Sequence, residues 1–186
     1  MENKDKIILH LCASEFGSDT RDYKAAGYDV RYITKEIGVE NYHPPKNVYG
    51  IIANPPCTEF AVSGARWWKE KGNKPLETAL KIVDECLRII EEAKPKFWML
   101  ENPVGRLRAL RKDKLGEPRL IFHPCDYGDT YTKKTLVWGN FNLPKKNPMK
   151  SVGKNKIHYA PPGEKRGDLR SIASPYFTKA FFLSNP

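Results

Sequence analysis

The strongest constraint on this 186-residue chain is a series of short apolar runs separated by helical or loop segments. Each run has the length and composition of one buried strand. The six runs are Lys6–Cys12, Tyr28–Thr34, Val48–Asn54, Lys96–Glu101, Arg119–Phe122 and Thr135–Trp138. Between the third and the fourth, Pro75–Ala93 repeats its apolar residues at helical spacing. Strands that alternate with helices or loops predict a single α/β domain over residues 1–186, with a mostly parallel sheet.

Three further segments complete the expected fold. Ser18–Ala26 is short and closed by a glycine, which favours a helix. Thr58–Lys74 is polar and predicts a loop, with two tryptophans inside it. Ile172–Leu183 carries three phenylalanines at spacings that favour a terminal helix.

The composition excludes several classes of protein. A hydrophobic fraction of 40% is ordinary for a globular chain and argues against a disordered or fibrous one. No run of about 18 apolar residues occurs, so we expect no membrane span. The N-terminal residues contain no apolar signal-peptide core, so we expect a cytoplasmic protein.

The net charge of +10 is concentrated in two stretches. Residues 105–120 carry an excess of four cations, and residues 140–170 an excess of six. Concentrated positive charge favours a polyanionic partner, and a nucleic acid is favoured over a membrane because no amphipathic basic helix occurs. A solvated surface is the alternative explanation for either stretch.

The four cysteines do not indicate a metal site. No Cys-x-x-Cys pair occurs, and the pairs His10/Cys12 and His123/Cys125 each stand at the end of an expected buried strand. A cysteine in that position serves as a small apolar residue. We therefore expect no bound metal.

Ligands of such sheets bind beyond the carboxyl ends of the strands. Cys57 follows the third run within Asn54-Pro55-Pro56-Cys57, where two prolines hold the chain extended. It is a candidate nucleophile, provided that the site lowers its pKa or supplies a base. Glu101 ends the fourth run, where partial burial would raise its pKa and let it donate a proton near neutral pH. A structural cysteine and a helix-capping acid are the alternatives.

A third candidate group directly precedes the sixth run. Residues 131–135 include Lys133 and Lys134, and their cations could hold a phosphate or an anionic intermediate. An exposed turn is the alternative explanation.

Taken in order, these motifs resemble those of the cytosine-5 DNA methyltransferases, especially small phage-encoded members. The family's loop Pro-Cys-Gln-x-Phe-Ser-x-x-Gly is similar to residues 56–64, Pro-Cys-Thr-Glu-Phe-Ala-Val-Ser-Gly. Its Glu-Asn-Val motif is similar to Glu101-Asn102-Pro103-Val104, with one inserted proline. Its Gln-x-Arg-x-Arg motif is echoed by residues 131–135, and its Arg-x-Leu-Thr-Pro segment by residues 170–175.

The resemblance implies a Rossmann-like class I methyltransferase fold and methyl transfer to carbon 5 of a flipped cytosine in DNA. Cys57 would attack carbon 6, and Glu101 would stabilise or protonate ring nitrogen 3. The substrate-binding residues would be Pro56, Phe60, Asn102, Lys133 and Lys134, with Trp67 and Trp68 on a loop that closes over the base. The methyl donor would be S-adenosylmethionine, held by Cys12, Ala13, Ser14, Gly17, Thr34, Glu36, Asn54 and Pro55.

The sequence also departs from the family pattern. Residues 12–17 hold one glycine where the family has Phe-x-Gly-x-Gly-Gly, and no counterpart of the family's last motif precedes Pro186. We therefore expect the free chain to bind S-adenosylmethionine weakly, and more tightly with DNA or as a homodimer. Residues 140–167 form a short basic insertion where the family has its target-recognition domain, so we expect that domain to be reduced or absent.

Two other functions stay open. Asn54-Pro55-Pro56 matches the amino-methyltransferase signature up to its aromatic residue, a position that Cys57 occupies here. A catalytically silent DNA-binding protein would explain the reduced glycine motif. The setting that the resemblance implies is restriction–modification in a bacterium or a phage-infected host cell.

Overall fold

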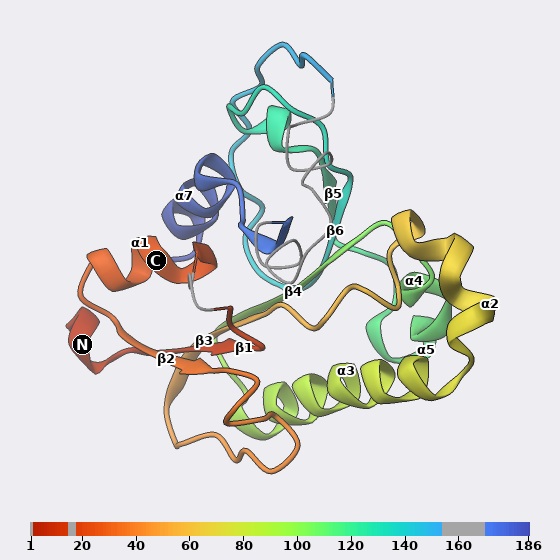
Figure 1. Ribbon diagram of the computed structural model, residues 1–186. Helices are drawn as coiled ribbons and strands as arrows, with labels where there is room; N and C mark the ends of the chain where they lie inside the picture. The colour runs from red at the N-terminus through yellow and green to blue at the C-terminus, as the bar shows by residue number, and fades with distance from the viewer. Residues whose placement is uncertain (1, 15–17, 154–169) are drawn as a thin grey trace.

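The computed structural model describes residues 2–14, 18–153 and 170–186. At its centre lies one six-stranded sheet with the strand order β2-β1-β3-β4-β6-β5 (Figure 1). The strands are β1 (Ile7–Leu11), β2 (Asp29–Ile33), β3 (Val48–Ala53), β4 (Phe97–Pro103), β5 (Leu120–Phe122) and β6 (Thr135–Asn140). The four strands from β2 to β4 are parallel neighbours, whereas β6 runs antiparallel to both β4 and β5. The expected α/β fold with a mostly parallel sheet is confirmed.

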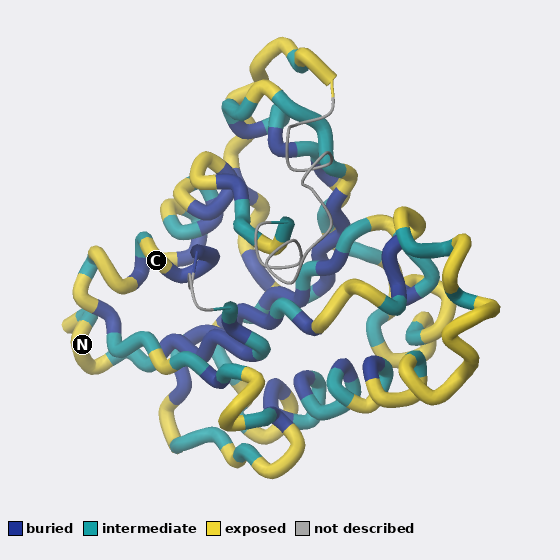
Figure 2. The backbone as a smooth tube through the Cα atoms, viewed as in Figure 1, coloured by how far each residue is buried: buried dark blue, intermediate teal, exposed yellow. Residues whose placement is uncertain are grey.

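Helices cover both faces of the sheet. The long helix α3 (Lys74–Ala93) packs on one face, and α1 (Arg21–Ala25) and α7 (Pro175–Ser184) pack on the other. The sheet and the facing sides of these helices form the buried interior in Figure 2, while the outer side of α3 is largely exposed. None of the helices in the described ranges is long and apolar enough to cross a membrane.

The two-residue period of the strands decides which side chain meets which helix layer. In β4, Leu100 belongs to the core beneath α3, whereas Phe97 and Met99 belong to the core beneath α1 and α7. The same alternation places Glu101 on the side of Phe97 and Met99. In β1 the alternation places His10 on the same side as Ile8. The side chains of Glu101 and His10 therefore share the face of the sheet that α1 and α7 cover.

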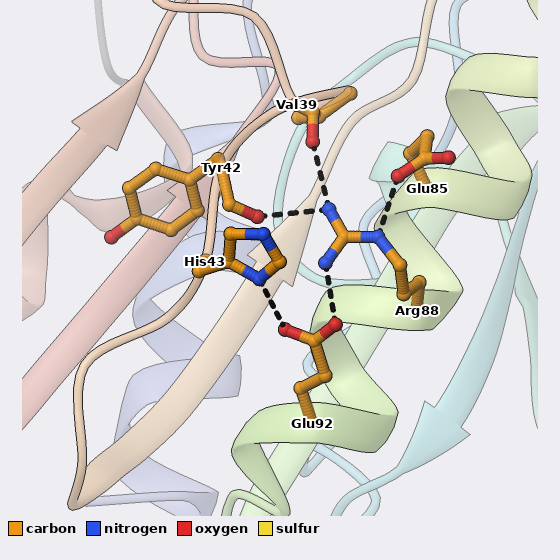
Figure 3. A network of polar contacts seen from close by, with 6 residues as sticks. All are labelled: Val39, Tyr42, His43, Glu85, Arg88 and Glu92. Atoms are coloured by element: carbon orange, nitrogen blue, oxygen red, sulfur yellow. Dashed lines mark hydrogen bonds and ion pairs between the residues drawn. The ribbon is translucent and has the colours of Figure 1, made fainter.

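A polar network fastens α3 to the loop between β2 and β3 (Figure 3). Arg88 on α3 donates to the backbone carbonyls of Val39 (3.2 Å) and Tyr42 (2.8 Å). The same guanidinium pairs with Glu85 and Glu92, and Glu92 also contacts His43. Because the backbone carbonyls of Val39 and Tyr42 both accept hydrogen bonds from the Arg88 guanidinium, the loop is held in a defined position beside the helix.

The structure corrects three expected elements. The predicted loop Thr58–Lys74 contains the 3₁₀ helix η3 (Val62–Trp67) and the short helix α2 (Trp68–Lys71). Strand β4 continues past Glu101 to Pro103, because β6 supplies antiparallel partners up to Thr135. The terminal helix starts at Pro175, where the Ser174 hydroxyl accepts the Phe177 amide and so caps its first turn.

The remaining elements are short. They are η1 (Asn3–Asp5), η2 (Ser18–Thr20), α4 (Leu107–Leu110), α5 (Lys112–Leu115) and η4 (Pro124–Asp126). The described part of the expected basic insertion, residues 141–153, is irregular and bonded to residues 125–132. The Met149 amide donates to Cys125 and the Val152 amide to Thr130, both at 2.8 Å. The remainder of the insertion, residues 154–167, lies outside the described residues.

Candidate active site

Cys57 stands at the first turn of the chain after β3. The Phe60 and Ala61 amides both donate to its carbonyl, at 2.9 and 2.8 Å, which closes a tight turn directly behind it. Pro55 is buried and accepts the Asn102 side-chain amide at 3.1 Å, whereas Pro56 and Cys57 are exposed. The predicted residues Pro55 and Asn102 therefore hold the two motifs together beside Cys57.

A backbone contact joins the Cys57 loop to the end of β4. The Val62 amide donates to Val104 at 3.1 Å, and the Arg106 amide donates to Phe60 at 3.0 Å. Gly105 permits this approach, because a Cβ atom there would overlap the Phe60 carbonyl group. The position of the cysteine is thus tied to the strand that carries Glu101.

Phe60, which the motif predicts to bind the substrate, has a fully buried side chain. It belongs to the core beneath α3 that also contains Leu107 and Leu136. The ring therefore anchors the loop to the fold. Of the three expected aromatic residues, Trp67 is exposed, and the Trp68 ring stacks under the Arg106 guanidinium at 4.1 Å.

Glu101 lines a pocket between β4, the start of β6 and the segment before α7. The other polar residues of this pocket are Asp19, Tyr131, Lys133, Thr135, Ser171 and Ser174, and two of its apolar walls are Phe122 and Phe177. These two rings are stacked with their centroids 4.1 Å apart. Desolvation in this setting raises the pKa of Glu101, and the Asp19 carboxylate raises it further, although Lys133 opposes both. Burial therefore favours the neutral acid that the sequence predicted.

The electrostatics of Cys57 depend on Glu101. Desolvation raises the pKa of the Cys57 thiol, and the negative charge of Glu101 adds to the effect. The cations of Lys133 and Arg170 act in the opposite direction. A protonated Glu101 removes the repulsion, so the thiolate is easiest to form when the proton is on the glutamate. Nucleophile and acid are thus electrostatically coupled.

Of the two lysines before β6, the structure brings only Lys133 to the pocket. Its Nζ donates to the Arg170 carbonyl at 3.1 Å, which fixes the ammonium beside Glu101 and Asp19. Lys134 is exposed, and its carbonyl accepts the Val104 amide at 3.2 Å. The alternation of side chains along an extended segment accounts for the difference, because neighbouring residues face opposite ways.

Several residues expected to bind the cofactor meet at the carboxyl edge of β1, β2 and β3. Ala13 donates its amide to Ile33 at 3.1 Å, and Asn54 donates its amide to Leu11 at 3.0 Å. The strand register aligns the ends of all three strands at Leu11. Thr34 and Glu36 follow β2, and a hydrogen bond from the Thr34 hydroxyl lowers the pKa of the exposed Glu36 carboxyl.

The other three predicted cofactor residues, Cys12, Ser14 and Gly17, differ from one another. The Cys12 sulfur lies 3.7 Å from the Cys86 sulfur on α3, so its side chain belongs to the interface with that helix. Ser14 is described and half-buried, whereas Gly17 lies outside the described residues.

Within the described ranges, no group of three or more His, Cys, Asp or Glu side chains is arranged to hold a metal ion.

The structure adds two buried polar residues that motif reading missed. Asp19 lines the pocket beside Glu101, and His10 sits behind it on β1. Asp19 lay in a segment expected to be a plain helix, and His10 was weighed only as a metal ligand. The available signal was a histidine on the core-facing side of an otherwise apolar strand.

The two basic stretches differ in how their cations are engaged. In residues 105–120 each of the six cations has a partner within the protein. Arg108 and Lys112 pair with Glu117, and Arg111 and Lys114 pair with Asp84, whereas Arg106 and Arg119 donate to the backbone carbonyls of Glu59 and Phe141. In residues 141–153, by contrast, Lys145 and Lys150 are exposed and have no ion pair with a described residue, and Lys146 makes a loose contact of 3.6 Å with Asp126. The second stretch is therefore better able to bind phosphates.

The fold is similar to that of a solved methyltransferase. A crystal structure of an E. coli protein, described as a candidate DNA modification methyltransferase encoded within a prophage, superimposes with a TM-score of 0.50 at 14% identity. The match covers 86% of this chain and 56% of that one, and at this identity it establishes the fold alone.

The family model of the C-5 cytosine-specific DNA methylases matches residues 16–119, more than half of the chain, and the chain belongs to this family. It is 30% identical over 94 residues to the type II methyltransferase M.SacI of Streptomyces achromogenes. It is 28% identical over 107 residues to the type II methyltransferase M.DdeI of Desulfomicrobium norvegicum. Each match covers 50% of this chain, but only 23% and 24% of those relatives.

Proposed function

We propose that the protein is a DNA cytosine-5 methyltransferase in which Cys57 is the nucleophile and Glu101 the acid. The observation that carries this proposal is the placement of Cys57 just beyond β3 and of Glu101 on the neighbouring parallel strand β4, where the Asn102 side-chain amide donates to the Pro55 carbonyl. Family membership supports the same assignment. An amino-methyltransferase would have no use for the thiol, and a silent DNA-binding protein would have no use for either group.

The reaction follows from the chemistry of the ring. Carbon 5 of cytosine is a poor nucleophile. When the Cys57 thiolate forms a bond to carbon 6, carbon 5 becomes electron-rich. Glu101 gives its proton to ring nitrogen 3 as negative charge develops there, and Lys133 stabilises the resulting carboxylate. After carbon 5 has gained a methyl group, it loses its proton to a base and the carbon–sulfur bond breaks. Ring nitrogen 3 returns its proton to Glu101 in this step, so both Cys57 and Glu101 are restored.

The residues that would hold S-adenosylmethionine lie at the edge formed by β1, β2 and β3. Glu36 offers an exposed carboxylate to ribose hydroxyls, and Thr34, Ala13 and Asn54 lie at the same edge. Bound there, this cofactor supplies an electrophilic methyl group. The chain's own task is to present the activated base, and the base must leave the duplex to reach Cys57.

Incubation with DNA and labelled S-adenosylmethionine, followed by nucleoside analysis, tests the proposed reaction. We expect label in 5-methylcytosine. Label in N4-methylcytosine or N6-methyladenine would establish an amino-methyltransferase instead. DNA binding without any transfer of label would establish a silent binding protein.

The single glycine of residues 12–17 leads to an expectation for cofactor affinity. Side chains replace the bare backbone that would approach the cofactor closely, so S-adenosylmethionine should bind weakly to the free chain. Addition of DNA should strengthen the binding. Titration calorimetry with and without a DNA duplex measures both affinities. Tight binding to the free monomer would show that this loop accommodates the cofactor despite its side chains.

The lysines of residues 141–153 lead to an expectation for DNA affinity. Each phosphate that a cation neutralises contributes roughly 0.9 to the slope of log affinity against log salt. Replacement of Lys145, Lys146 and Lys150 by Gln should therefore weaken binding and flatten that slope by up to about 3. Fluorescence anisotropy over a series of salt concentrations measures it.

A matched triple variant controls for net charge. Lys4, Lys46 and Lys81 are also exposed, and their replacement by Gln removes the same charge from other parts of the surface. It should leave the slope nearly unchanged. Equal slopes for the two triple variants would show that residues 141–153 are an ordinary solvated surface and do not bind DNA phosphates.

A further inference from the structure

A buried polar chain leads from β1 to the acid of the proposed reaction. His10 on β1 contacts the Thr20 hydroxyl at 3.2 Å and the Asn54 amide oxygen at 2.9 Å. The Asn54 amide nitrogen donates to an Asp19 carboxyl oxygen at 3.5 Å, and the same amide lowers the pKa of Glu101, which lines the pocket together with Asp19. One amide group thus lies beside two carboxyls, although the proposed reaction needs only one of them.

The direction of these hydrogen bonds is determined by the groups involved. The Asn54 nitrogen faces the carboxyls, so its oxygen faces His10, and the His10 Nε2 atom must carry a proton to donate. Burial lowers the pKa of His10 to about 4, so the ring is neutral and Nδ1 accepts from Thr20. A neutral histidine therefore holds the Asn54 amide in the orientation that serves both acids.

The charges around the two acids are unequal. Asp19 is buried and accepts the Ser18 hydroxyl at 3.2 Å. The cations that act on Asp19 are Lys133 and Arg21, whereas Lys133 is the cation that acts on Glu101, and the charge of Glu101 in turn acts on the Cys57 thiol. Two desolvated carboxylates that share Lys133 repel each other, so the pair retains a proton more readily than either acid alone.

We propose that Asp19 is a positioning residue for Glu101: the two side chains form an acid pair, oriented by His10 through Asn54, that retains one proton on Glu101 for transfer to the bound base. This role rests on the proposed function, since the base is the acceptor. In the reaction Glu101 loses the proton to ring nitrogen 3, and Lys133 then faces two carboxylates. When the carbon–sulfur bond breaks, ring nitrogen 3 returns this proton to Glu101.

The ionisation of Glu101 can be measured without any methylation. In protein labelled with carbon-13 at the glutamate and aspartate carboxyls, NMR titration follows each acid, and Glu101→Gln assigns the Glu101 signal. Asp19→Asn removes the neighbouring charge while keeping the shape of the side chain. We expect the midpoint of Glu101 to move to lower pH in Asp19→Asn and to stay unchanged in Asp5→Asn, an exposed site far from the pocket.

The wild-type protein provides a test that does not depend on a variant that folds. Acids that share a proton titrate with common macroscopic midpoints. The Asp19 and Glu101 signals should each show two inflections at the same two pH values. Two results would overturn the proposed pair. One is an independent single-step titration curve for each acid, and the other is a Glu101 midpoint that is the same in the wild type and in Asp19→Asn.

The pH profile of catalysis connects the pair to the reaction. The alkaline limb of kcat/KM for methyl transfer reports loss of the proton from Glu101 in the free enzyme. In Asp19→Asn this limb should move to lower pH, in parallel with the NMR midpoint, a change that simple loosening of the fold would not cause. If Asp19→Asn shifts the NMR midpoint of Glu101 but leaves the alkaline limb of kcat/KM where it is in the wild type, the catalytic role of the shared proton is overturned. If no methyl transfer occurs in the wild type, the proposed function fails, and NMR still decides whether the acid pair exists.

Discussion

Cys57→Ala is expected to abolish both methyl transfer and covalent trapping on DNA that contains 5-fluorocytosine. In the wild type, the fluorine at carbon 5 cannot leave as a proton does, so the protein should remain bonded to carbon 6 after one methyl transfer. The alanine variant has no nucleophile to form that bond. Denaturing electrophoresis detects the trapped complex, and mass spectrometry of the linked peptide should place it on Cys57.

The other three cysteines serve as controls for this variant. Cys86 is fully buried on α3, Cys12 lies against it, and Cys125 is half-buried after β5. Their alanine variants should change the free energy of unfolding more than the chemistry. Cys57→Ala should still bind DNA, because the lysines of residues 141–153 are untouched. Methylation that survives in Cys57→Ala would rule out the proposed mechanism.

Glu101→Gln is expected to raise the activation free energy by about 2–4 kcal/mol, a loss of roughly 30- to 1,000-fold in rate. Glutamine keeps the shape of the side chain and can still donate a hydrogen bond, but it cannot transfer a proton to ring nitrogen 3. The variant should also lose the alkaline decline of the wild-type rate. That sign follows from the raised pKa of Glu101: the active acid is present at low pH and is lost as pH rises through the midpoint.

Single-turnover kinetics over a range of pH measures both effects. Glu91→Gln removes one carboxylate from the exposed side of α3 and should leave the rate unchanged. An alkaline decline that persists in Glu101→Gln would assign the titrating group to another residue. An unchanged rate in Glu101→Gln would exclude it as the acid.

Much of the fold could be predicted because its elements have strong local patterns. The apolar runs match the six strands within a few residues. The predicted helix before β4 begins at Pro75, and the observed helix α3 begins one residue earlier, at Lys74. The Pro-Cys and Glu-Asn motifs were found by reading the ends of those runs. The antiparallel direction of β6 was not evident, because a strand's own alternation carries no information about the direction of its partner.

The site shows the same division between local pattern and tertiary contact. The strands, helix α3 and the position of Cys57 after two prolines follow from local sequence, since these depend on periodicity and on backbone restriction by proline. Three features depend on contacts between distant segments: the burial of Phe60 in the core, the approach of Lys133 rather than Lys134 to the pocket, and the positions of His10 and Asp19 near Glu101. The residues that make these contacts are far apart along the chain, as His10 and Asn54 are with a separation of 44 residues. Burial and shared charge arise when β1, β3 and β4 align in one sheet, and no short segment carries either property alone.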